Sequence, residues 1–136
     1  MLQPWQVARS RLANEGMPIR VLIADDSPPI RKAVRQLLVV EPEIEIVGEA
    51  CSFREMVELR AKLQPDIVVM DLHMIEESEG ASEELKGSTS PLIAMSICAP
   101  DEGAAKAKEI GAVTFLDKAF LYEELIPTIR EFAGAR

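Results

Sequence analysis

The sequence predicts a doubly wound α/β fold, a (βα)5 arrangement around a five-stranded parallel sheet with a shortened third helix. The first observation is a set of short runs rich in β-branched and aliphatic residues, at residues 19–24, 44–50, 66–70, 91–97 and 112–116. Most of these runs are predominantly apolar, as expected for parallel strands that are buried on both faces. The second observation is that segments with helical spacing of apolar residues separate the runs.

Capping signals place helices between the expected strands. Ser27 is followed by two prolines, which are tolerated in the first turn of a helix because no hydrogen-bond donor is lost there. Ser52 and Glu55 have the spacing of a capping box. Asp101 is expected to cap an alanine-rich helix that stops at Gly111, because glycine readily adopts the left-handed conformation that ends many helices.

Two segments fit this pattern less well. Residues 74–90 contain few apolar side chains, so we expect a loop with one short helix near 82–86. The last helix contains Pro127, and a proline inside a helix costs about 3 kcal/mol. We therefore expect its regular part to begin near 124–126, or the helix to kink.

The ends of the chain are expected to lie outside the alternating core. Residues 1–18 precede the first strand and are interpreted as an N-terminal extension, and residues 134–136 as a tail. Trp5, Ala8 and Leu12 have helical spacing, which favours a short helix packed on the domain or on a neighbouring copy.

Composition narrows the class of protein. The chain has 136 residues, of which 48% are hydrophobic and 28% charged, as is usual for one globular domain. The net charge of −8 argues against direct binding to nucleic acid through a basic face. No apolar run approaches the roughly 20 residues of a membrane span, so we expect a cytoplasmic protein without membrane contact. In that setting Cys51 and Cys98 are expected to be buried, reduced thiols.

Polar side chains end four of the expected strands, where they can form a site. These residues are Asp25 and Asp26, Asp71, Ser96 and Lys118. In an open parallel α/β sheet, ligands bind beyond the carboxyl ends of the strands. Three carboxylates, a hydroxyl and an ammonium would therefore gather at one edge, where they could hold a divalent cation and a phosphoryl group together.

Asp71 is the most informative of these residues because it ends a strongly apolar strand. A buried carboxylate opposite an acidic pair would be costly to ionise without a cation or Lys118 nearby. Mg²⁺ prefers oxygen ligands and keeps several waters, so two carboxylates and one carbonyl suffice to bind it. An oxygen of Asp71 then becomes a candidate nucleophile toward phosphorus.

Residues 19–132 resemble the receiver domain of bacterial two-component response regulators, the CheY-like superfamily with a flavodoxin-like fold. The resemblance is carried by the five polar residues above and by the segments PEIEIVGEA and GAVTFLDK. It implies a receiver domain over residues 19–133. It also implies that Asp71 accepts the phosphoryl group, that Asp26 binds Mg²⁺ directly and Asp25 partly through water, and that the main-chain carbonyl of His73 is a further ligand.

The resemblance also implies roles in phosphate binding and switching. Lys118 would pair with phosphoryl oxygens, and Ser96 would donate its hydroxyl to the phosphoryl group and report its arrival. Phe115 matches an aromatic position that moves inward during switching, although it could also be an ordinary strand aromatic. His73 and Cys98 occupy positions that tune the lifetime of the phosphoryl group in this family, and His73 could equally be a loop residue without a special role.

Several positions depart from the family pattern. Ile75 and Ala119 replace prolines, so we expect the Lys118–Ala119 bond to be trans, since a cis bond without proline costs about 2.5–4 kcal/mol. Ile97 is bulky where the family has a small residue. An acidic run follows the phosphoacceptor position and is either a solvated loop or a source of repulsion toward phosphate; it comprises Glu76, Glu77 and Glu79.

Three functions are open at this point. The first is a switch that accepts a phosphoryl group from a sensor histidine kinase or phosphotransfer protein, with at most slow self-catalysed phosphorylation and dephosphorylation. Because the chain ends soon after the last helix, its output would pass through a downstream protein partner or self-association rather than a DNA-binding domain, unless such a domain was removed. The second is a degenerate receiver that acts as an unphosphorylated interaction module. The third is an aspartyl phosphohydrolase, which needs a second acid where His73 stands.

Overall fold

The computed structural model describes residues 18–77, 85, 90–97 and 100–134. Five strands form one sheet in the order β2-β1-β3-β4-β5, and every neighbouring pair is parallel. The strands are β1 (Ile19–Ala24), β2 (Ile44–Ala50), β3 (Ile67–Asp71), β4 (Leu92–Ser96) and β5 (Thr114–Asp117). The predicted doubly wound sheet is confirmed, with strand limits that differ from the expected ones by at most two residues.

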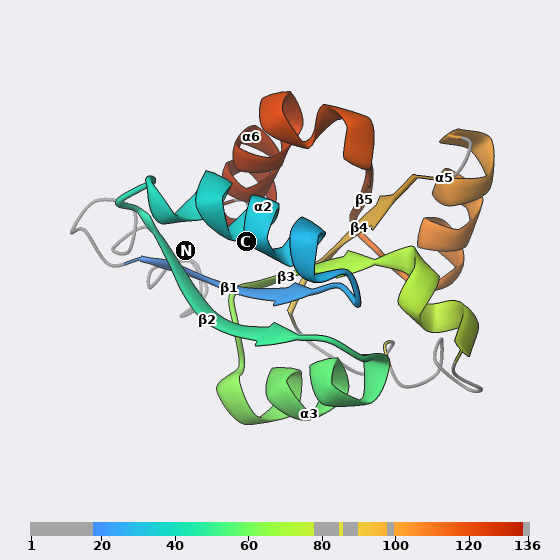
Figure 1. Cartoon of the computed structure of the whole chain (residues 1–136), viewed down its shortest axis with the longest axis horizontal. Helices are drawn as coiled ribbons and strands as arrows, with labels where there is room; N and C mark the ends of the chain where they lie inside the picture. Colours follow the sequence, from blue (N-terminus) through green and yellow to red (C-terminus); the bar gives the residue numbers. More distant parts are fainter. Residues whose placement is uncertain (1–17, 78–84, 86–89, 98–99, 135–136) are drawn as a thin grey trace, which may run out of the picture.

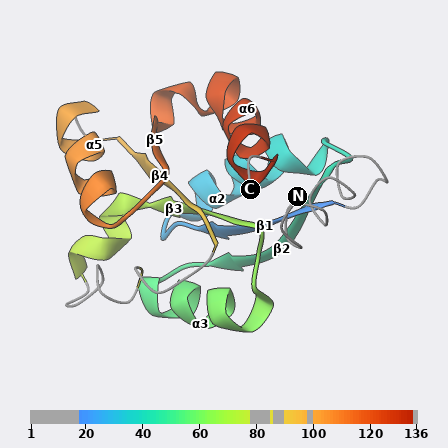
Figure 2. The same cartoon turned by 180° about the vertical axis from the view of Figure 1, so that it is seen from behind.

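Helices cover both faces of this sheet (Figure 1). The α-helices are α2 (Pro28–Val39), α3 (Phe53–Leu63), α5 (Pro100–Glu109) and α6 (Leu121–Gly134), and the 3₁₀ helices are η1 (Leu72–Glu77) and η2 (Lys118–Phe120). One buried cluster joins the sheet to α2 and α6, and a second joins it to α3 and α5. Both views place α5 and α6 on either side of the β4–β5 end of the sheet (Figures 1 and 2).

The capping predictions are largely confirmed. The Ser27 hydroxyl accepts the N–H of Ile30 at 3.4 Å, and the Ser52 hydroxyl accepts the N–H of Glu55 at 3.1 Å. Gly111 has a φ of 79° and ends α5, with its N–H donated to the carbonyl of Lys108. This left-handed conformation strains residues with a side chain, which explains the glycine.

Three details of the sequence interpretation are wrong. Asp101 lies inside the first turn of α5 rather than at its cap, because the helix already begins at Pro100. The last helix begins at Leu121 rather than near 124–126 and contains Pro127 at an exposed position, and the alternative expectation of a kink stays a prediction. Cys51 is exposed rather than buried, because it follows the carboxyl end of β2, just before α3 is capped.

Other expectations fall on residues outside the described ranges. They include the packing of Trp5, Ala8 and Leu12, and the burial of Cys98. Most of the helix expected at 82–86 also falls outside; within it only Leu85 is described, and this residue is helical and buried. None of the described helices is both long and apolar enough to cross a bilayer.

The aromatic ring of Phe115 lies directly against α5. Phe115 is partly buried and packs on the cluster beneath α3 and α5. Gly103 of α5 is buried under this ring, and a Cβ atom built there would lie closer than 3.0 Å to two ring atoms. Glycine inside a helix costs about 1 kcal/mol relative to alanine. The close approach of the ring gives a reason for the glycine at this position.

We predict that Gly103→Ala destabilises the protein by about 1–3 kcal/mol because the methyl group displaces the Phe115 ring. In a Phe115→Ala background the same change should instead stabilise the protein by about 0.5–1 kcal/mol, since helix propensity alone then acts. Urea unfolding of the four proteins measures this reversal of sign. Ala104→Gly, at an exposed position in the same helix, is the control and should be destabilising in both backgrounds. Equal effects of Gly103→Ala in both backgrounds would refute the contact.

Candidate functional site

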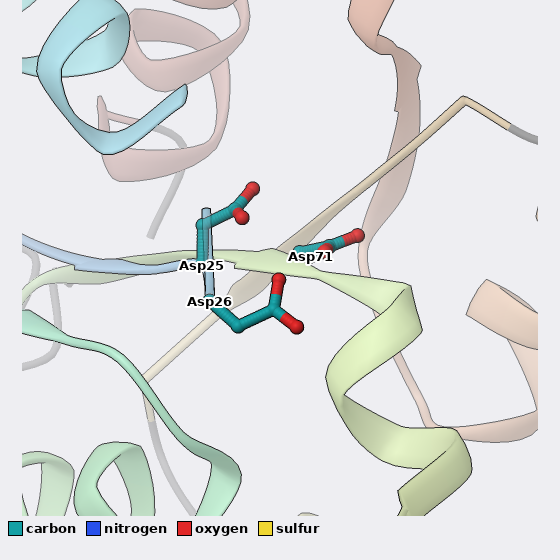
Figure 3. Close-up of side chains that lie close together, drawn as sticks. All are labelled: Asp25, Asp26 and Asp71. Atoms are coloured by element: carbon teal, nitrogen blue, oxygen red, sulfur yellow. The ribbon is translucent and has the colours of Figure 1, made fainter. Parts of the chain in front are cut away.

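Three carboxylates converge where β1 and β3 end side by side. Asp71 is the last residue of β3, and Asp25 and Asp26 follow β1 directly. Each offers an oxygen atom, and these atoms all lie within 4.8 Å of one another. Figure 3 shows the side chains of Asp25, Asp26 and Asp71 extending from the strand ends toward the same side of the view. Asp25 and Asp71 are buried and Asp26 is exposed.

The Lys118 ammonium lies beside the two buried carboxylates. Its Nζ is 2.8 Å from Oδ2 of Asp25 and 3.4 Å from Oδ1 of Asp71. Oδ2 of Asp25 nevertheless receives no hydrogen bond of good geometry, so this contact is chiefly a charge interaction. A buried carboxylate oxygen without a hydrogen-bond donor is suited to a cation ligand.

The backbone around Asp25 is held from several directions. Its N–H donates to the carbonyl of Ala50 at 3.1 Å, and its own carbonyl accepts Nη1 of Arg31 at 2.7 Å. Oδ1 of its side chain accepts the N–H of Ser27 at 2.8 Å, which joins the first carboxylate to the cap of α2. These contacts fix the carboxylate in place before any ligand arrives.

Asp71 is bonded on one oxygen only. Oδ1 accepts the N–H of His73 at 3.1 Å and faces Lys118, whereas Oδ2 has no partner among the described residues. Burial raises the pKa of the Asp71 carboxyl above its ordinary value, and the charge of Asp25 adds to the rise. The His73 N–H and the Lys118 charge lower this pKa and offset part of the effect.

All five predicted polar residues line one hollow of about 460 Å³. Ser96 ends β4 and is buried, one strand away from Asp71. The same hollow is lined by Ile30, His73, Ile97 and Lys106, and Ile97 is 81% exposed. Phe115 does not line it; its ring lies on the α5 side of the sheet. The structure thus brings together the residues predicted for metal and phosphate contact, including the predicted switch residue Ser96, and places the other predicted switch residue, Phe115, outside this hollow.

Sequence interpretation missed two residues that shape the site. Arg31 holds the carbonyl of Asp25, and its position one turn into α2 was a signal that could have pointed to this contact. Asp117 accepts the N–H of Ala119 at 2.8 Å and caps the turn that carries Lys118. An aspartate before a short helix is a known capping signal, so this residue could also have been recognised. The Lys118–Ala119 bond is trans, as predicted.

Comparison with known proteins decides the family. Residues 21–130 match the family described as "Response regulator receiver domain". The chain belongs to this family. It is 36% identical over 126 residues to "Transcriptional regulatory protein PdtaR" of Mycobacterium tuberculosis (strain ATCC 25618 / H37Rv), a match that covers 91% of this chain and 60% of that protein. It is 38% identical over 105 residues to "Protein-glutamate methylesterase/protein-glutamine glutaminase 1" of Methanosarcina acetivorans, covering 74% of this chain and 30% of that protein. The chain thus spans only part of each of these relatives.

Solved structures agree with this assignment. The response regulator domain of Thermotoga maritima CheB superposes with a TM-score of 0.74 at 26% identity, covering 85% of this chain and 96% of that one. A chain in the crystal structure of the P1 domain of CheA3 in complex with CheY6 from R. sphaeroides gives a TM-score of 0.72 at 25% identity, covering 85% and 96%. Receiver domains are signalling domains that typically bind Mg²⁺ at an acidic cluster, and this chain has such a cluster.

We predict that Asp71→Asn raises the melting temperature by a few degrees at pH 7–8 when metal is chelated. The pKa of Asp71 is higher in the folded protein than in the unfolded chain, so its ionisation costs stability as the pH rises through the folded value. The advantage of the variant should therefore shrink toward pH 4 and below, where the wild-type carboxyl is protonated. Thermal unfolding across this pH range measures it.

The matched control for this experiment is Asp101→Asn, which removes a carboxylate from an exposed position. It should change the melting temperature less and without the same dependence on pH. A destabilised Asp71→Asn protein at pH 7–8 would mean that the attraction of Lys118 outweighs the burial of the carboxylate.

Proposed function

We propose that this domain is a phosphorylation-dependent switch that accepts a phosphoryl group on Asp71 from a sensor histidine kinase or a phosphotransfer protein. The observation that carries the proposal is Oδ2 of Asp71, which has no partner among the described residues and stands in a hollow lined by two other carboxylates and Lys118. Phosphoryl transfer needs positioning and neutralisation of charge more than covalent chemistry by the protein. These residues are suited to both tasks.

The donor set fits Mg²⁺ because its atoms are oxygens and two of the carboxylates are buried. Asp26 and Asp71 would bind the ion directly, Asp25 would bind partly through water, and the main-chain carbonyl of His73 would complete the protein ligands. When bound, the ion would neutralise charge on the carboxylates and on the phosphoryl oxygens.

The remaining steps belong to the residues of the chain. Oδ2 of Asp71 forms a bond to phosphorus as the bond from phosphorus to the donor histidine breaks, and the leaving imidazole keeps the electron pair and takes up a proton. Lys118 pairs with a phosphoryl oxygen, and the Ser96 hydroxyl donates a hydrogen bond to another. Movement of Ser96 toward the phosphoryl group would then change the space available to Phe115.

The partners proposed for this chain follow from the same chemistry. The complex of a CheA3 P1 domain with CheY6 supports a phosphotransfer partner. The output would pass to a downstream protein or to a second copy of the chain, in the cytoplasm, with no direct contact to nucleic acid given the net charge of −8. Self-catalysed phosphorylation and dephosphorylation would be slow.

One observation favours the alternative of an unphosphorylated interaction module. Ile97 is 81% exposed on the wall of the hollow, where a bulky side chain would hinder an approaching donor. Replacement of Ile97 by alanine should therefore speed phosphorylation if the hollow is a working site, and should have no effect if it is not.

We predict that incubation with Mg²⁺ and acetyl phosphate adds one phosphoryl group to the wild-type protein and none to Asp71→Asn. Intact-mass measurement at a series of times detects the product. Asp101→Asn is the control and should be phosphorylated like the wild type. Addition of a phosphoryl group to Asp71→Asn at the wild-type level would exclude Asp71 as the sole acceptor. No addition to the wild type with either acetyl phosphate or a kinase would favour the interaction module.

We also predict that beryllofluoride with Mg²⁺ produces only a modest further burial of Phe115. The ring is already partly buried and packed on Gly103 without a phosphoryl group, so the two conformations should differ little in free energy. NMR chemical shifts of the ring, with and without beryllofluoride, measure the change. A ring that moves from full exposure to full burial on addition of beryllofluoride would contradict this expectation.

A further inference from the structure

The position of the Lys118 ammonium beside Asp25 depends on the path that the backbone takes after β5. Lys118 follows β5, whereas Asp25 follows β1, and the strand order places two strands, β4 and β3, between them. Neighbouring strands are about 4.7–4.9 Å apart, so these strand ends would be about 14 Å apart in a flat sheet. The Lys118 ammonium nevertheless lies 2.8 Å from Asp25. A lysine side chain alone does not span this width, so the Asp25 side chain and the turn of the backbone after β5 must both contribute.

A single side-chain contact closes that turn. β5 ends at Asp117, which has an extended backbone (φ −76°, ψ 127°), and residues Lys118–Phe120 form η2. The Asp117 carboxylate accepts the N–H of Ala119 at 2.8 Å, so acceptor and donor lie on either side of Lys118. This bond fixes the direction in which the lysine leaves the strand.

The other roles available to Asp117 are not supported by its contacts. Its carboxylate is not one of the three that converge on the candidate metal site. The ion pairs of Lys118 within the described part of the chain are with Asp25 and Asp71, not with its neighbour Asp117. The bond to Ala119 also requires a backbone N–H that a proline at position 119 would lack. The cap therefore depends on both the Asp117 carboxylate and the backbone N–H of Ala119.

We propose that Asp117 is a positioning residue that holds Lys118 between Asp25 and Asp71, and that phosphoryl binding depends on its cap. The inference rests on the proposed function, because Lys118 is the group that would meet the phosphoryl oxygens. Asp117 itself belongs neither to the carboxylate cluster nor to the ion pairs of Lys118. The cap restricts the conformations of Lys118 in the free protein, so Lys118 loses less conformational entropy when a phosphoryl group binds.

The test compares Asp117→Ala with Asp117→Asn. Both variants remove the same negative charge, but the asparagine side chain keeps an oxygen that can accept the N–H of Ala119. We expect Asp117→Ala to weaken beryllofluoride binding and to slow phosphorylation by acetyl phosphate about fivefold, the equivalent of the roughly 1 kcal/mol that such a cap contributes. Asp117→Asn should stay within about twofold of the wild type.

Two further measurements separate positioning from general destabilisation. Glu123→Ala, which removes an exposed carboxylate from the first turn of α6, is the matched control and should leave both activities unchanged. In a Lys118→Met background, Asp117→Ala should have no further effect on beryllofluoride binding, because the positioned group is gone. Urea unfolding of each variant verifies that the proteins are folded under the assay conditions.

Equal losses in Asp117→Ala and Asp117→Asn would overturn the proposal and assign the effect to charge. Wild-type behaviour of Asp117→Ala would overturn it as well. If the wild-type protein is neither phosphorylated nor able to bind beryllofluoride, the proposed function fails and crystal structures of the two variants decide the inference. Displacement of the Lys118 ammonium from Asp25 in Asp117→Ala alone would support it, and an unmoved ammonium would overturn it.

Discussion

The close packing of two buried carboxylates at the ends of neighbouring strands is the constraint on which the site depends. Asp25 and Asp71 are brought together by the parallel pairing of β1 and β3, and like charges in a poorly hydrated place repel one another. The ammonium of Lys118, which follows the edge strand β5, offsets part of this repulsion. The Ser27 N–H donates to the Asp25 carboxylate, and Ala50 and Arg31 hold the backbone of Asp25, so the carboxylate stays where repulsion would otherwise displace it. The chain therefore uses several hydrogen bonds to maintain one unfavourable arrangement.

The fold connects this site to the α5 side of the sheet through two adjacent strands. Ser96 of β4 is paired in register with Asp117 of β5, and Ala94 is paired with Phe115 two residues earlier. The turn that positions Lys118 and the ring that packs on Gly103 thus lie on the same short strand. Gly103 lets α5 pack directly against that ring.

Local chemistry explains which features could be predicted from the sequence. Buried parallel strands must be apolar on both faces, so their runs are visible, and the polar residues that end them are conspicuous for the same reason. Ser27, Ser52 and Gly111 act on backbone groups within a few residues, so their roles can be deduced without the fold. The exposure of Cys51 could not, because a position one residue past a strand end is set by how the loop meets the following helix.

The contact between Gly103 and Phe115 shows the limit of such reasoning. The two residues are on different elements, and helix propensity alone marks Gly103 as an unfavourable choice. The glycine is explained only by the packing of α5 on the β4–β5 end of the sheet, where the Phe115 ring leaves no room for a Cβ atom. Pro127 is a similar case, since its cost inside α6 depends on whether the carbonyl left without a partner can reach water, which the sequence does not reveal.

Charge balance explains why the carboxylate cluster suits both a divalent cation and a phosphoryl group. Three carboxylates and the Lys118 ammonium leave two negative charges unbalanced when all are ionised, which equals the charge of one divalent cation. Adding a phosphoryl group to Asp71 replaces one negative charge by about two near neutral pH, so the balance is lost again. In the proposed switch, the groups that would respond are the Lys118 ammonium, which would turn from the carboxylates to the phosphoryl oxygens, and the buried hydroxyl of Ser96. Because Lys118 lies in η2, after β5 has ended, such a change of partners would not require a strand to break.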